Sequence, residues 1–121
     1  MSASQRRKGL VYEREVAAAF RGAMPGCEAN RGLSQTRGGA TECADVELEH
    51  FTVEAKHRQA PNVRAALEQA IASEQPGKWP IAVCKWNRRS GEKAGLETVT
   101  MRLEDFLELA GVWWLEVGSG R

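Results

Sequence analysis

Residues 44–57 read ADVELEHFTVEAKH, and this stretch decides the fold. Apolar residues occupy every second position on both sides of a central Glu-His pair, which is the period of β-strands with one buried face. The pattern predicts two short strands, Cys43–Glu49 and Phe51–His57, joined as a hairpin that turns near Glu49-His50.

Three charged residues in this hairpin suggest a catalytic site. Glu54 and Lys56 share one face of the second strand, with Ala55 opposite, and the pairing brings Asp45 near Glu54. Mg²⁺ prefers oxygen ligands and is commonly held by one or two carboxylates plus water and substrate phosphate. A lysine beside such an ion can position a nucleophilic water at a phosphodiester. The alternative is an ordinary ion pair on an exposed strand.

A helix is predicted before the hairpin, over about Leu10–Ala23, ended by Pro25-Gly26. Glu13 falls on its apolar stripe, whereas Glu15 faces elsewhere. A carboxylate on a buried stripe is costly unless something offsets it. We therefore expect Glu13 to reach the hairpin as a third acid. The stripe consists of Val16, Ala17, Phe20 and Met24.

The rest of the chain alternates helical and extended patterns around a glycine-rich loop. A second helix opens at Pro61-Asn62 and stops at Gln75-Pro76-Gly77. Its apolar face is Val63, Ala66, Leu67, Ala70 and Ile71. The other predicted segments are a loop over 27–41, a buried strand Trp79–Trp86, a strand Thr98–Leu103, a short helix Glu104–Ala110, and a last strand or docking tail Val112–Val117.

This order of elements predicts one α/β or α+β domain, residues 1–121, built on a mixed central sheet flanked by helices. Residues 1–8 are expected to form a basic, flexible leader.

The charge distribution says more than the net charge of +1. Residues 1–40 carry seven Lys or Arg and three acids, residues 41–55 five acids and no base, and residues 56–95 eight bases and three acids. An acidic segment between basic ones suits a metal site that meets a polyanion. An acidic hairpin beside solvated basic helices is the alternative.

Several classes of protein are disfavoured. No apolar run exceeds five residues, and no apolar segment follows the basic N-terminus, so we expect neither a membrane span nor a secretory signal. The three cysteines lack CxxC spacing and neither histidine has a partner at ligand spacing, which disfavours zinc. Reduced thiols indicate a cytoplasmic protein.

Taken together, these motifs resemble the PD-(D/E)XK nuclease superfamily, most closely the archaeal-type Holliday junction resolvases. The similar segments are RKGLVYER at 7–14, RGLS at 31–34, ADV at 44–46, VEAK at 53–56, LEQA at 67–70, Ile81–Lys85 and Leu103–Leu107.

The resemblance implies a restriction-endonuclease-like αβββαβ core and a role for each matching residue. Asp45, Glu54 and the carbonyl of Ala55 would bind Mg²⁺ or Mn²⁺, assisted by Glu13, and Lys56 would activate water. Ser34 would contact the scissile phosphate, and Gln69 would support Lys56 or a metal-bound water. For these last two residues, a plain turn serine and a solvent-facing helix residue are the alternatives.

The implied activity is metal-dependent, structure-specific cleavage of branched DNA by a homodimer, most simply Holliday junction resolution in recombination and repair. The expected setting is the cytoplasm of a bacterial, archaeal or phage-infected cell. Candidate phosphate contacts are Arg6, Arg7, Lys8, Arg31, Arg37, Arg58, Arg88, Arg89 and Lys93.

Two rival functions stay open: a nuclease for flaps, single strands or damaged duplex, and a non-catalytic DNA-binding domain of the same fold. Unlike the usually basic resolvases, this chain is nearly neutral. Its four tryptophans favour packing over base stacking, and the cluster at 112–115 is a candidate dimer interface.

Overall fold

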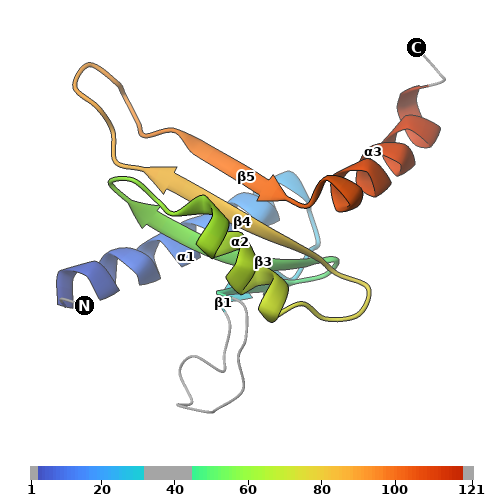
Figure 1. Ribbon diagram of the computed structural model, residues 1–121, viewed down its shortest axis with the longest axis horizontal. Helices are drawn as coiled ribbons and strands as arrows, with labels where there is room; N and C mark the ends of the chain where they lie inside the picture. The colour runs from blue at the N-terminus through green and yellow to red at the C-terminus, as the bar shows by residue number, and fades with distance from the viewer. Residues whose placement is uncertain (1–2, 32–44, 119–121) are drawn as a thin grey trace.

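The hairpin at residues 46–58 is the centre of the fold, in a computed structural model that describes residues 3–31 and 45–118 (Figure 1). The elements are α1 (Ala3–Ala23), β1 (Asn30–Arg31), β2 (Val46–Leu48), β3 (Phe51–Arg58), α2 (Val63–Ala72), β4 (Trp79–Trp86), β5 (Glu97–Met101) and α3 (Leu103–Val117). The strands form one sheet in the order β1-β2-β3-β4-β5.

The strand pairing makes the sheet mixed. β3 and β4 run parallel, with α2 connecting them, and the other neighbouring pairs are antiparallel. The predicted α/β class, with a mixed sheet flanked by helices, is therefore confirmed. The loop prediction over 27–41 missed β1, a two-residue strand that pairs with β2.

The predicted hairpin is present, with its turn at the expected place. Val46 pairs with Val53, and Leu48 pairs with Phe51. His50 takes a positive φ of 71°, the left-handed conformation that a tight turn requires. The first strand of the hairpin, β2, begins at Val46, so Asp45 immediately precedes it; Cys43, where the strand was predicted to begin, lies outside the described residues.

Alternating residues of β4 are buried in two separate hydrophobic cores. Ile81 and Val83 pack with the cluster that includes α1, whereas Ala82 and Cys84 pack with the cluster that includes α2. Because successive side chains of a strand point to opposite faces, α1 and α2 cover opposite faces of the sheet, as Figure 1 shows.

The first helix is longer than predicted. The leader prediction is wrong for residues 3–8, which form the beginning of α1. This segment contains Ala, Gln, Arg and Lys, all good helix formers, and Gly9 does not interrupt it. The apolar stripe is confirmed by the burial of Val16 and Ala17. Tyr12, only 1% exposed, is one of the largest side chains in the core.

The second helix begins as its sequence predicts. Asn62 is the N-cap, and its side-chain oxygen accepts a 3.0 Å hydrogen bond from the amide of Ala65. Ala66 and Ala70 are buried against the sheet, so α2 lies close to β3 and β4.

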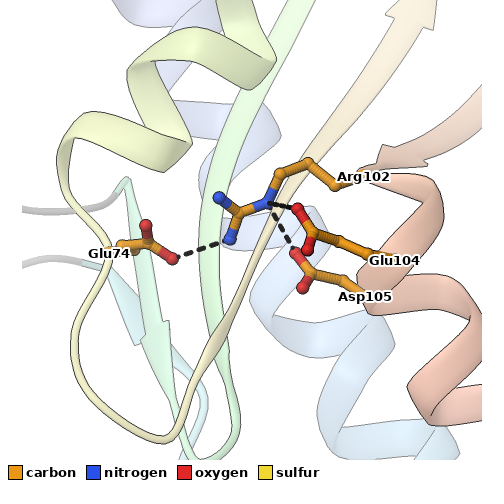
Figure 2. Close-up of polar contacts among 4 residues, drawn as sticks. All are labelled: Glu74, Arg102, Glu104 and Asp105. Carbon is orange, nitrogen blue, oxygen red and sulfur yellow. Dashed lines mark hydrogen bonds and ion pairs between the residues drawn. The ribbon is translucent and has the colours of Figure 1, made fainter.

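The predicted helix Glu104–Ala110 is present but continues further: a single helix, α3, spans Leu103–Val117, so the strand expected at Val112–Val117 is wrong. Apolar residues keep helical spacing across Gly111, which outweighs the strand preference of the Val-Trp-Trp run. Figure 1 shows α3 leading away from the sheet. Figure 2 shows how its start is held: Arg102 forms ion pairs with Glu74, beyond the end of α2, and with Glu104 and Asp105.

In the part of the chain that the structure describes, no helix is long and apolar enough to cross a membrane. Cys27 and Cys84 are free thiols, and Cys43 lies outside the described residues.

Candidate active site

A pocket of about 260 Å³ opens at the edge of β3, just past the point where β2 stops pairing with it. β4 accompanies β3 over all eight residues, but β2 pairs only with Phe51–Val53. The pocket therefore lies where one side of β3 has no neighbouring strand among the described residues. Its lining residues are Arg6, Gly9, Leu10, Glu13, Asp45, Ala55, Lys56, His57 and Arg58.

Asp45 is fixed to this edge by the backbone of β3. Its Oδ2 accepts a 3.0 Å hydrogen bond from the amide of Ala55. In an antiparallel pair, the amide and the carbonyl of one residue point to the same side of the strand. The carbonyl of Ala55 thus points toward Asp45 as well, as a metal-ligand role would require.

Glu54 is a buried carboxyl group, only 6% exposed. Burial raises the pKa of Glu54 to about 9. A hydrogen bond with Asp45, the negative charge of Asp45 and, to a smaller extent, that of Glu13 also raise this pKa, whereas Lys56 lowers it. The predicted proximity of Asp45 and Glu54 is confirmed, and without a cation Glu54 holds a proton at neutral pH.

Lys56 lies on the same face of β3 as Glu54, as predicted. Its Nζ lies 3.9 Å from Oε2 of Glu54, and 30% of its side chain is exposed. Ala55 belongs to the core on the opposite face, beneath α1. The ammonium of Lys56 therefore lies near the carboxyl group of Glu54, beyond hydrogen-bond distance, and Lys56 lines the pocket.

Glu13 reaches the pocket from α1. It is 8% exposed, whereas Glu15 is exposed to solvent, so the predicted difference between these two acids is confirmed. Glu13 lines the pocket together with Asp45 and Lys56. Three chain segments, separated in sequence, thus supply the four charged residues of the predicted site.

The oxygen atoms at this site could supply only part of the ligand shell of a hard divalent cation. Within residues 3–31 and 45–118, no three His, Cys, Asp or Glu side chains form a metal-binding group by themselves. Mg²⁺, however, commonly takes one or two protein carboxylates and completes its coordination with water and substrate phosphate. Asp45 and Glu54, with the carbonyl of Ala55, could supply that share, and a cation would offset the negative charges that crowd Glu54.

Basic segments that are distant in sequence meet beside the pocket. Lys8 Nζ donates a 2.7 Å hydrogen bond to Oδ1 of Asn87, and the amide of Asn87 donates one of 3.0 Å to the carbonyl of Arg58. These contacts hold the first turns of α1, the end of β3 and the β4–β5 loop at one end of the sheet (Figure 1). The predicted phosphate contacts that these segments contain are Arg6, Arg7, Lys8, Arg58, Arg88, Arg89 and Lys93.

Some predicted site residues are not part of this arrangement. Gln69 is exposed on α2 and is not a lining residue of the pocket. Ser34 and Arg37 lie outside the described residues, as does the side chain of Arg31.

His57 also lines the pocket, a position that was not predicted from the sequence, where the histidines were considered as zinc ligands. Its ring lies 5.4 Å from the ring of Tyr12, centroid to centroid, so it also packs. Burial, together with the positive charges of Lys8 and Lys85, lowers the pKa of His57. Its place one residue after Lys56, on the strand that carries the site, was the signal available in the sequence.

Comparison with models of protein families, with curated proteins and with solved structures finds no match for this chain.

Proposed function

We propose that this protein is a metal-dependent endodeoxyribonuclease with a restriction-endonuclease-like core, and that it cleaves branched DNA such as Holliday junctions. The observation that carries the proposal is the convergence of Glu13, Asp45, Glu54 and Lys56 at one edge of β3. A buried carboxyl group whose pKa is raised by burial and by neighbouring acids, beside a lysine that lines a pocket, is typical of functional sites.

Each of these residues has a distinct role in the proposed reaction. Asp45 and Glu54, with the Ala55 carbonyl, would hold Mg²⁺ or Mn²⁺, and Glu13 would add negative charge from α1. When bound, the ion would supply Lewis-acid polarisation of a phosphodiester. Lys56, held 3.9 Å from Glu54, donates hydrogen bonds that orient the attacking water and stabilise charge on the phosphate oxygens.

The basic residues at this end of the sheet favour binding of a polyanionic substrate. Arg6 and Arg58 line the pocket itself, and the Lys8–Asn87 contact brings the β4–β5 loop alongside. Contacts of this kind position a nucleic acid without reading its sequence. They favour recognition of DNA shape over recognition of a base sequence.

The test is a cleavage assay on four substrates of matched sequence: a four-way junction, a flap, a single strand and a linear duplex. We expect cleavage of the junction in Mg²⁺ or Mn²⁺, and none in EDTA. Lys56→Gln and Asp45→Asn should each lower the cleavage rate by at least about a hundredfold while junction binding is kept. Lys78→Gln, which removes the same charge away from the pocket, is the matched control.

The outcomes separate the competing functions. Preference for the flap, single strand or linear duplex would replace the junction by that substrate. Tight DNA binding without cleavage in either metal would favour a non-catalytic binding domain. Metal-dependent cleavage that survives both site substitutions would reject the proposed active site.

A further inference from the structure

α3 presents an unusually apolar surface to solvent. Leu103, Phe106, Leu107, Trp113 and Trp114 are between 51% and 71% exposed. At 100° per residue they fall on one continuous face, together with Ala110 and Val117. Large contiguous apolar patches on soluble proteins mark interaction sites.

The acidic residues of α3 exclude two kinds of partner. Glu104, Asp105, Glu108 and Glu116 lie on the opposite side of the helix, and residues 103–117 contain no Lys or Arg. Anionic lipid surfaces and nucleic acids both select basic helices. The face therefore suits an apolar protein surface.

The order of residues along the face suits pairing with a second copy of α3. Ala110 is the midpoint of the helix, and the apolar positions of this face are symmetric about it: 103 with 117, 106 with 114, and 107 with 113. The other apolar residues, Leu109, Val112 and Leu115, lie outside the face. In an antiparallel helix pair with a two-fold axis at Ala110, Leu107 meets Trp113 of the other copy and Phe106 meets Trp114. A two-fold interface requires such self-complementarity.

The size and spacing of the face agree with a helix pair. Apolar residues recur at intervals of three, four and seven, the spacing of packed helices, and the small Ala110 allows close approach at the centre. Aromatic side chains bury about 150–250 Å² each, so the five large residues leave on the order of 600 Å² of apolar surface uncovered. A standard interface buries about 800 Å² per partner.

We propose that two copies of this chain associate through α3, antiparallel, about a two-fold axis at Ala110. The interface is the face of Leu103, Phe106, Leu107, Ala110, Trp113, Trp114 and Val117, and not the contiguous 112–115 run. Val112 and Leu115 lie on the acidic side. The pairing rests on α3 alone and would stand if the chain cut no DNA.

Sedimentation equilibrium of the full chain from about 1 to 100 µM tests the pairing. The wild type is expected at twice its 13.3 kDa mass. Leu107→Glu, on the face, should weaken the dimer at least about tenfold. Leu115→Glu adds the same charge on the same helix at a residue that is 78% exposed, and should leave the mass unchanged.

Crosslinking tests the geometry. A short bis-maleimide should join two Ala110→Cys chains well above the wild-type background but should not join Val112→Cys chains. Circular dichroism checks that each variant keeps its helices. A monomeric wild type at about 100 µM, equal weakening by Leu107→Glu and Leu115→Glu, or equal crosslinking at 110 and 112 would overturn the proposal.

Discussion

Asp45 Oδ2 accepts a hydrogen bond from the backbone amide of Ala55 at 3.0 Å, although ten residues separate them in sequence. The carboxylate occupies the place that a paired strand would take, one residue beyond the last pair between β2 and β3. This bond has a structural role that can be measured apart from any catalytic one.

Asp45→Ala should lower the free energy of unfolding by about 1–2 kcal/mol, because it leaves the Ala55 amide without its acceptor. Asp45→Asn keeps an acceptor oxygen for the Ala55 amide, so its stability should stay within about 0.5 kcal/mol of the wild type. Urea unfolding at pH 7 measures both. Equal destabilisation by the two variants would contradict the role given to the hydrogen bond.

Glu54 makes stability depend on pH. Its pKa is raised to about 9 in the folded protein, so between its ordinary pKa of 4.5 and about 9 the folded state retains a proton that the unfolded state releases. Stability therefore falls as pH rises through this range. The free energy of unfolding, measured without divalent cations, should fall from pH 5 to pH 8 by at least about 1 kcal/mol more in the wild type than in Glu54→Gln.

The same proton gives a metal-binding readout. If Asp45 and Glu54 bind Mg²⁺, the ion must displace the Glu54 proton, so affinity should rise with pH. Added Mg²⁺ should raise the melting temperature of the wild type more at pH 8 than at pH 6. Glu54→Gln should show a smaller increase at both pH values, and an equal increase would locate the ion elsewhere.

Tyr12 can be titrated directly, because it is the only tyrosine in the chain. Its hydroxyl donates a 2.9 Å hydrogen bond to Oε2 of Glu97. Burial and, to a smaller extent, this hydrogen bond raise the pKa of Tyr12 well above the ordinary range. Absorbance at 295 nm should show no phenolate in the folded protein at pH 11, and ionisation near pH 10 in urea.

Tyr12→Phe checks the linked effect on stability. The unfolded chain loses the phenolic proton above about pH 10 while the folded chain keeps it, so the wild type should lose stability there. The variant should lack this contribution. Phenolate formation in the native protein near pH 10 would show that the Tyr12–Glu97 contact is not maintained in solution.

Asp105 and Glu104 allow a matched comparison of two ion pairs with Arg102 at the start of α3. Both contact Arg102, but the Asp105 contact is 2.9 Å with a side chain that is 12% exposed, whereas the Glu104 contact is 4.0 Å with one that is 79% exposed. Asp105→Ala should cost about 1–2 kcal/mol of stability, and Glu104→Ala less than about 0.5 kcal/mol. Thermal unfolding measures both variants, and equal losses of stability in Asp105→Ala and Glu104→Ala would contradict this prediction.

The hairpin and α2 could be predicted because their signals are local. Strict alternation fixed the register around Val46 and Val53, and Asn62 marked the start of α2. The burial of Glu13 also followed from helical spacing alone. For these elements, the residues that determine the structure lie within a few positions of one another.

The errors came from features that local patterns do not determine. Whether the Val112–Val117 segment forms a strand depends on a partner strand, and β5 instead leads directly into α3. The pocket role of His57 depends on where β2 stops, which is set by pairing between distant segments. The hydrogen bond between Lys8 and Asn87, which brings the basic segments together, is likewise a tertiary contact that local patterns do not determine.

The early end of β2 has a consequence for solubility. A strand edge with unpaired amides is a template on which another chain can add a strand, the first step of aggregation. Asp45 already accepts a hydrogen bond from the Ala55 amide that an incoming strand would use. Asp45, which we assign to the proposed active site, therefore also limits the addition of another strand at this edge of β3.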